Sequence, residues 1–200
     1  MLDTKGQPII QPLLDTLADT FIKWKLTANE VTGIAVSIGI AASVWIYIDL
    51  VWLGIAFLWL SGLLDAVDGT MARKTKPSAV GTVLDVTFDR VVEGGIILVL
   101  AIKYPEHSVV LLLLMFSILI AMTLFLTIGN VARNSGRKSF HYATGLAERT
   151  EGFILLTVMV IFAPTWLFWT TLLFIVIEVL STVLRFTAFV KEERELHERT

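Results

Sequence analysis

Four aspartates in one short stretch of this sequence have the residue type and spacing of a metal centre. Asp65 and Asp68 are three residues apart and Asp85 and Asp89 are four apart, so each pair shares one face of a helix. The segment between the pairs is short and basic, which brings both pairs to the same depth. Carboxylate oxygens without a nearby histidine or cysteine suit hard cations such as Mg²⁺, Mn²⁺ or Ca²⁺. The stretch Leu64–Glu93 therefore predicts a metal-dependent phosphate site.

Small residues and one arginine accompany the aspartates. Gly69, Ala72 and Gly81 carry almost no side chain, so a bulky ligand or a neighbouring helix can approach the backbone there. Arg73 supplies a planar cation suited to phosphate oxygens. These residues fit a site that holds phosphate groups beside a metal.

The composition indicates what kind of fold must carry this site. Of 200 residues, 56% are hydrophobic and 17% are charged, and the mean hydropathy is +0.77. These values exclude a soluble globular domain and indicate an integral membrane protein, in which a helical bundle satisfies its own backbone hydrogen bonds. Four aspartates facing lipid would cost on the order of 10 kcal/mol, so they must face a wet cavity or a cation. The lack of cysteine excludes thiolate chemistry, and the net charge of −2 offers no basic surface for nucleic acid.

The expected fold is an all-α integral membrane protein with six transmembrane helices after an amphipathic surface helix. The predicted spans are Val31 to Ile48, Leu50 to about Asp65, Gly81 to Ile102, Ser108 to about Asn130, Glu151 to Ala163 and Trp166 to Val190. Residues 1–29 form a juxtamembrane segment, in which apolar residues recur at three-to-four spacing between Ile9 and Trp24. This helix is expected either to lie on the membrane surface or to pack on the bundle's own loops. Residues 30–190 form the catalytic domain and residues 191–200 a cytoplasmic tail.

The positive charges predict the orientation. Of the 16 lysines and arginines, thirteen fall in the amino end, the Met71–Val80 loop, the Val131–Thr150 loop and the tail, and only Lys103 lies on the other side. Because cytoplasmic loops carry the excess of Lys and Arg, both termini and the aspartate site are expected on the cytoplasmic face of a multi-pass cell-membrane protein.

The order Asp65-x2-Asp68-Gly69-x2-Ala72-Arg73-x7-Gly81-x3-Asp85-x3-Asp89 resembles the signature of the CDP-alcohol phosphotransferase family. The segment LTANEVT, residues 26–32, is similar to the start of that family's first span, and six spans is the family's count. The resemblance implies a transferase that joins the phosphoryl group retained from a CDP-linked donor to an alcohol and releases CMP.

The resemblance also implies a role for each residue of the pattern. Asp65, Asp68 and Asp85 would be metal ligands for Mg²⁺ or Mn²⁺, two ions in all, and Asp89 would lie near the metals and act as base on the acceptor hydroxyl. The nucleotide and pyrophosphate pocket would be lined by Gly69, Ala72, Arg73 and Gly81, with Asn29 and Thr32 as further candidates. Both of these last two residues are equally suited to capping a helix. The family further implies a homodimer.

The acceptor is less closely specified. The segments GTVLDVTFDR and GLAERTEG are similar to the branch that contains the inositol-phosphate lipid synthases, where a lysine and arginines hold the acceptor's phosphate. Arg133, Arg149 and Arg185 would supply cations here, but Val131 and Gly152 stand where the lysine and one arginine are expected. The polar residues within spans expected to line the acceptor cavity are Glu93, Asn130 and Glu178.

Three functions remain open from the sequence. The first is transfer from a CDP-lipid to a small polar alcohol or its phosphate. The second is transfer from a water-soluble CDP-alcohol to a diradylglycerol. The third is a cation carrier, which the clustering of the carboxylates at one end of the membrane disfavours.

Overall fold

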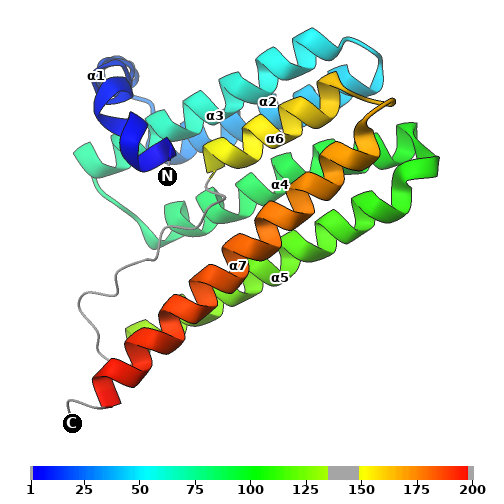
Figure 1. Ribbon diagram of the computed structural model, residues 1–200. Helices are drawn as coiled ribbons and strands as arrows, with labels where there is room; N and C mark the ends of the chain where they lie inside the picture. Colours follow the sequence, from blue (N-terminus) through cyan, green and yellow to red (C-terminus); the bar gives the residue numbers. More distant parts are fainter. Residues whose placement is uncertain (1, 135–148, 198–200) are drawn as a thin grey trace.

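The computed structural model describes residues 2–134 and 149–197, with side chains described for 10–131 and 150–195. All regular structure in these residues is helical, which confirms the all-α prediction (Figure 1). The elements are α1 (Leu2–Lys23), α2 (Ala28–Tyr47), α3 (Val51–Lys74), α4 (Ala79–Lys103), the 3-10 turn η1 (Pro105–His107), α5 (Ser108–Asn134), α6 (Arg149–Ile161) and α7 (Leu167–His197).

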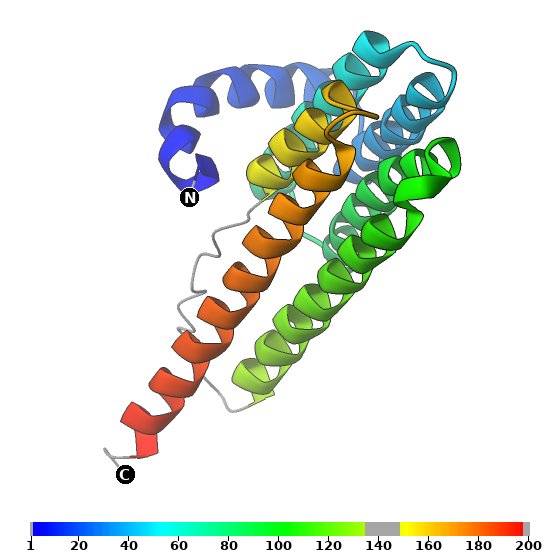
Figure 2. The same ribbon diagram turned by 45° about the vertical axis from the view of Figure 1, so that its right-hand side comes forward.

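Helices α2 to α7 share one buried core. α2 packs on α3 and α4, α5 packs on α4 and α7, and α6 contacts α3, α4 and α7. Figures 1 and 2 both show α5 and α7 side by side. One fully buried residue from each of α2 to α6 lies in the core: Ala42, Leu58, Ile96, Leu111 and Leu156. In a bilayer it is the close packing of such side chains that holds helices together.

One glycine allows α3 and α4 to approach α2 closely. A Cβ added to Gly39 would lie 2.8 Å from Ser61 Oγ and would overlap the side chain of Val92. Ser61 Oγ in turn donates a hydrogen bond of 2.7 Å to the Ala35 carbonyl oxygen of α2. Small residues at such contacts let helix backbones meet, so the two helices that carry the aspartates are both anchored on α2.

Near the aspartates, the helix boundaries differ from the expected ones. α3 runs nine residues past Asp65 to Lys74, and α4 begins at Ala79, so the connection is residues 75–78 rather than the longer loop predicted from residue 71. The predicted end near Asp65 is wrong because tertiary contacts continue the helix where the hydrophobicity stops. Met71, in this extension, is 1% exposed and packs in a cluster with residues of α1.

Four described helices are long and apolar enough to cross a membrane: α2, α3, α5 taken together with η1, and α7. α4 has 25 residues but carries Asp85, Asp89, Arg90 and Glu93. α6 has 13 residues, short of the roughly 20 that a span needs. The structure thus shows four candidate membrane helices where the sequence predicted six. α7 continues to His197, so the described part of the predicted tail is helical.

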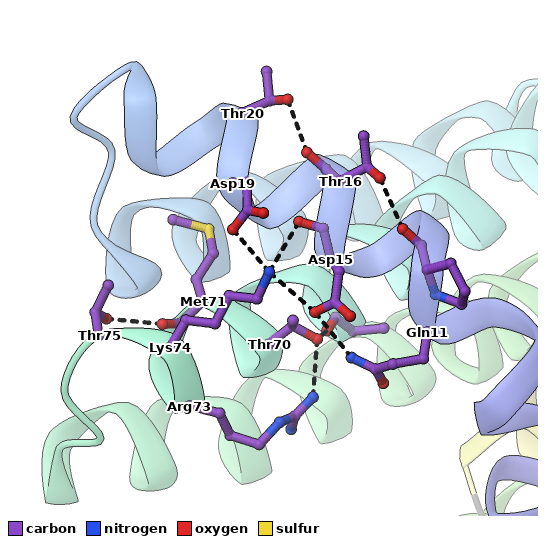
Figure 3. Close-up of polar contacts among 12 residues, drawn as sticks. Gln11, Asp15, Thr16, Asp19, Thr20, Thr70, Met71, Arg73, Lys74 and Thr75 are labelled. Atoms are coloured by element: carbon purple, nitrogen blue, oxygen red, sulfur yellow. Dashed lines mark hydrogen bonds and ion pairs between the residues drawn. The ribbon is translucent and has the colours of Figure 1, made fainter.

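α1 lies against the C-terminal end of α3 (Figure 3). Leu14 and Ala18 are buried in this contact. Lys74 Nζ of α3 lies 3.1 Å from Asp15 Oδ1 and 2.7 Å from Asp19 Oδ1. The hydrogen bond from Lys74 holds the pKa of Asp15 below its usual value. This face of α1 therefore packs on the bundle, and it does so on a helix rather than on loops.

Candidate active site

Three of the four predicted aspartates form one cluster. Asp65 and Asp68 come from the C-terminal half of α3, and Asp85 comes from the second turn of α4. One carboxylate oxygen from each lies within 4.8 Å of the other two. Asp65 and Asp68 are buried, at 6% and 4% exposed, and Asp85 is half-buried. The short connection between α3 and α4 thus brings Asp65 and Asp68 to Asp85, so three of the four carboxylates that were predicted to converge do so, and Asp89 is not among them.

Charge repulsion makes this cluster costly without a cation. Two unit charges 4.8 Å apart repel by about 3.5 kcal/mol at an effective dielectric constant of ~20, and the cluster contains three such pairs. Asp68 Oδ2 is buried and has no hydrogen-bond partner among the described residues. A buried carboxylate oxygen needs a partner or a metal to offset its lost hydration. The all-carboxylate donor set fits Mg²⁺ or Mn²⁺.

The start of α2 lies next to the cluster and to the start of α4. Thr32 is buried and interacts with Asp68. A Cβ added to Gly81 would lie 3.1 Å from Asn29 Oδ1, tighter than an ordinary contact, so the start of α2 lies close to the start of α4. The N-cap of α2 is Thr27, which excludes capping as the role of Asn29 or Thr32. Of the two candidates of α2 for the nucleotide site, Thr32 therefore lies beside Asp68, and Asn29 lies beside Gly81 at the start of α4.

The C-terminal end of α3 presents the arginine and the two small residues. Gly69, Ala72 and Arg73 follow Asp65 at helical spacings of four, seven and eight, so they lie along one face. Arg73 is exposed, and its Nη2 donates a hydrogen bond of 2.9 Å to Thr70 Oγ1 (Figure 3). A Cβ on Gly69 would meet only Arg73 Nη1, at 3.6 Å, so the helix backbone is open to a ligand at this point.

Asp89 lies one turn beyond Asp85 on α4 and is not part of the three-aspartate cluster. It lines a neighbouring cavity of about 260 Å³ that is open on one side and is lined by residues of α4, α5, α6 and α7. The other lining residues are Val86, Arg90, Glu93, Ile118, Ala121, Met122, Phe125, Gly152, Phe174, Glu178 and Arg185. The structure thus separates one aspartate, at the boundary between cluster and cavity, from three that can share a cation.

Two of the charged residues of this cavity form an ion pair. Arg90 Nη1 lies 2.8 Å from Glu93 Oε2 and Nη2 lies 3.0 Å from Glu93 Oε1, a bidentate ion pair. Glu178 lies within electrostatic range of both Arg90 and Arg185. The guanidinium of Arg185 also stacks over the Phe125 ring, 5.1 Å from its centroid.

The acceptor-site predictions have mixed outcomes. Glu93, Glu178 and Arg185 line the cavity as predicted, whereas Asn130 is not among its lining residues. The side chains of Arg133 and Arg149 lie outside the described residues. The sequence analysis did not assign Arg90 to the site, although its spacing of three from Glu93 on a helix is typical of an ion pair.

Comparison with known proteins identifies the chemistry of such a site. The family model described as CDP-alcohol phosphatidyltransferase matches residues 25–177. The chain belongs to this family. It is therefore a membrane-associated transferase of phospholipid biosynthesis, and the cation-carrier alternative is dropped.

Relatives and solved structures agree with this assignment. The chain is 28% identical over 174 residues to the inner membrane protein YnjF of Escherichia coli, covering 83% of this chain and 84% of the relative. It is 30% identical over 158 residues to a phosphatidylinositol phosphate synthase of Mycobacteroides abscessus, covering 76% and 69%. The Mycobacterium tuberculosis phosphatidylinositol phosphate synthase, solved with manganese and citrate, has the same fold: TM-score 0.70, 21% identity, and 88% of each chain covered. The same enzyme has also been solved with CDP-DAG bound, with a TM-score of 0.65 over 89% of this chain and 94% of that one.

Proposed function

We propose that the protein transfers a phosphatidyl-type group from a CDP-lipid to a small polar alcohol or alcohol phosphate, with release of CMP. The observation that carries the proposal is the cluster of Asp65, Asp68 and Asp85 beside a polar cavity that Asp89 lines. The bound CDP-DAG in the M. tuberculosis enzyme supports a CDP-lipid as donor. The similarity to a phosphatidylinositol phosphate synthase supports a hydroxylated acceptor.

Asp65, Asp68 and Asp85 are the proposed ligands of Mg²⁺ or Mn²⁺, with Asp89 as a further ligand at the edge of the cluster. The buried, unpartnered Asp68 Oδ2 and the manganese in the related structure support this assignment. We infer two ions, which would stabilise negative charge on the attacking and leaving oxygens. A nucleotide and pyrophosphate would lie along the open face of α3 and the adjoining ends of α2 and α4. The proposed contacts are Gly69, Ala72, Arg73, Gly81, Asn29 and Thr32.

Asp89 is the proposed base, because it is the aspartate that faces the acceptor cavity. Its carboxylate accepts the proton of the acceptor hydroxyl, and the acceptor oxygen forms a bond to the phosphorus of the lipid phosphate. The bond from that phosphorus to the bridging oxygen of the pyrophosphate breaks, and CMP leaves with the bridging oxygen. Arg185, with Arg133 and Arg149, is proposed to orient the acceptor.

We infer that α4 and α6 also span the membrane, giving six transmembrane helices over residues 30–190. The charges of α4 face the aspartate cluster and the cavity rather than lipid, which supports this inference. The active site and both termini would be cytoplasmic, and two copies would form a homodimer.

The outer side of α1 is proposed to lie on the membrane surface. Ile10 and Leu13 of α1 are 48% and 54% exposed, and Trp24, directly after the helix, is 67% exposed, whereas the other face of α1 packs on α3. Apolar and aromatic side chains at the boundary of a bilayer anchor such helices. Residues 1–29 would then both anchor the protein to the membrane and pack against α3, the helix that carries Asp65 and Asp68.

Release of CMP from CDP-diacylglycerol by detergent-purified protein, with Mn²⁺ or Mg²⁺ and a panel of alcohols, tests the proposal. Asp85→Asn should abolish turnover, because a neutral amide cannot hold a divalent cation among phosphates as a carboxylate does. Glu106→Gln removes an exposed carboxylate from η1, away from the cluster, and is the matched control. Substantial activity in Asp85→Asn would contradict the proposal that Asp65, Asp68 and Asp85 share a cation. If CMP is released only from a soluble CDP-alcohol in the presence of diacylglycerol, the lipid is the acceptor and not the donor.

A further inference from the structure

We propose that the acceptor is an uncharged polyol rather than an alcohol phosphate, because the cavity beside Asp89 is built to receive hydroxyl groups and not a second phosphate. This inference rests on the proposed function and narrows its acceptor to one chemical class. It follows from the charges that line the cavity and from the way in which they are paired.

The described lining of the cavity is acidic on balance. It holds three carboxylates, Asp89, Glu93 and Glu178, against two guanidiniums, Arg90 and Arg185. A phosphorylated acceptor would bring roughly two negative charges into this space at neutral pH. Repulsion from the Glu93 and Glu178 carboxylates would oppose its binding.

Both guanidiniums of the described lining already have partners. Both terminal nitrogens of Arg90 contact the Glu93 carboxylate, which is 6% exposed, and only its Nε has no hydrogen-bond partner among the described residues. Arg185 is held over the Phe125 ring and lies within electrostatic range of Glu178. A phosphate that captured Arg90 would leave the buried Glu93 carboxylate without its partner, and that loss is severe inside a protein.

Hydroxyl groups match this lining. Each hydroxyl can donate to a carboxylate oxygen and accept from a guanidinium, so an array of them can bridge the Arg90–Glu93 pair without breaking it. Ile118, Met122 and Phe174 offer apolar wall to the C–H surface of a polyol. The cavity, with a volume of about 260 Å³, has room for a small polyol.

Gly152 of α6 provides a way to change the charge of the cavity. A Cβ added there would lie 3.6 Å from Glu93 Oε1 and 3.9 Å from Phe174 Cζ, which are ordinary contacts. The residue is inside a helix, where other residue types are accommodated without backbone strain. Gly152→Lys would therefore add a cation next to Glu93, and Glu178→Gln would remove an anion while preserving shape.

The first experiment compares matched acceptors on the full-length protein in detergent with CDP-diacylglycerol and Mn²⁺. Glycerol is set against glycerol 3-phosphate, and myo-inositol against inositol 1-phosphate, with CMP release as the readout. We expect kcat/KM for the better free polyol to exceed that for its phosphate by about tenfold or more. A phosphate ester that is the better substrate of its pair overturns the inference and would point to Arg133 and Arg149 as its ligands.

Calorimetric titration of each acceptor into the protein without CDP-lipid gives a readout that does not need turnover. Tighter binding of the free polyol supports the inference, and tighter binding of the phosphate overturns it. If no acceptor releases CMP, the proposed function fails while this titration still decides the charge preference.

The two charge variants test the stated cause. Glu178→Gln and Gly152→Lys should each raise the phosphate-to-polyol ratio of kcat/KM, or of affinity, by about tenfold, whereas Glu106→Gln should leave it unchanged. Two variants are needed because the lysine has to be accommodated at a buried position. An unchanged ratio in a folded Glu178→Gln protein overturns the assignment of specificity to the cavity charges.

Discussion

Replacing Asp85 by asparagine is expected to stabilise the metal-free protein and at the same time remove its response to metal. Asparagine has the shape of aspartate but no charge. Two carboxylates lie within 4.8 Å of Asp85, and each repels it by about 3.5 kcal/mol at an effective dielectric constant of ~20, or ~7 kcal/mol in all. Asp85 is half-buried, so water screens part of this repulsion. We expect about 1 to 3 kcal/mol to be measurable.

Thermal unfolding in detergent measures both effects. For a chain of this size 1 kcal/mol shifts Tm by about 2–4 °C, so Asp85→Asn should raise the apparent Tm in EDTA by about 2–12 °C. In the unmodified protein, Mn²⁺ at 100 times its Kd should add about 2.7 kcal/mol, or about 5–11 °C. The variant should lose most of that Mn²⁺ shift. All scans need one heating rate, because unfolding in detergent is often irreversible.

A matched control and a clear contrary result complete this test. Glu106→Gln removes an exposed carboxylate far from the cluster and should leave both the EDTA and the Mn²⁺ transitions near those of the unmodified protein. An Asp85→Asn protein that unfolds at a lower temperature in EDTA and keeps the full Mn²⁺ shift would refute the reasoning. In that case the three carboxylates would neither repel one another appreciably nor share a cation.

If Asp89 acts mainly as the base, Asp89→Asn should lower kcat by about 10²- to 10⁴-fold and leave the Kd for CDP-lipid nearly unchanged, because a base acts on the acceptor. An equal loss of titrated donor affinity would show that Asp89 acts mainly as a metal ligand. Lys74→Met should loosen α1, seen as faster amide hydrogen exchange in residues 10–23. The contact with Lys74 lowers the pKa of Asp15. The stabilisation of α1 by this ion pair is therefore fully present above the ordinary pKa of Asp15, and it is lost as the pH falls and the Asp15 carboxylate takes up a proton. For topology, a cysteine at Lys76 should react with an impermeant probe only from the cytoplasm and one at Tyr104 only from outside, and the chain has no native cysteine to interfere; the opposite pattern would invert the orientation.

The aspartate cluster could be predicted from the sequence because its geometry is almost local. Positions three or four apart share a helix face whatever the rest of the fold, and a short connection must return the second helix beside the first. The helix ends were harder to predict. Hydropathy falls after Asp65, yet α3 continues to Lys74 because Met71 packs in a cluster with α1 and Lys74 pairs with Asp15 and Asp19. Those contacts join positions more than 50 residues apart, and no local pattern reports them.

The sequence by itself determined the membrane class, the all-helical fold and the residues of the carboxylate cluster, because these depend on composition and on helical periodicity. Tertiary structure alone decided which charges meet in the acceptor cavity. Glu93 of α4 and Glu178 of α7 are 85 positions apart in the sequence. The hydropathy pattern indicates that each is a polar residue in an apolar helix, but it does not indicate which residues they contact. The cavity arises where α4, α5, α6 and α7 surround a common space. Which faces of those helices meet depends on the packing of the whole bundle, and that is a property of many side chains at once.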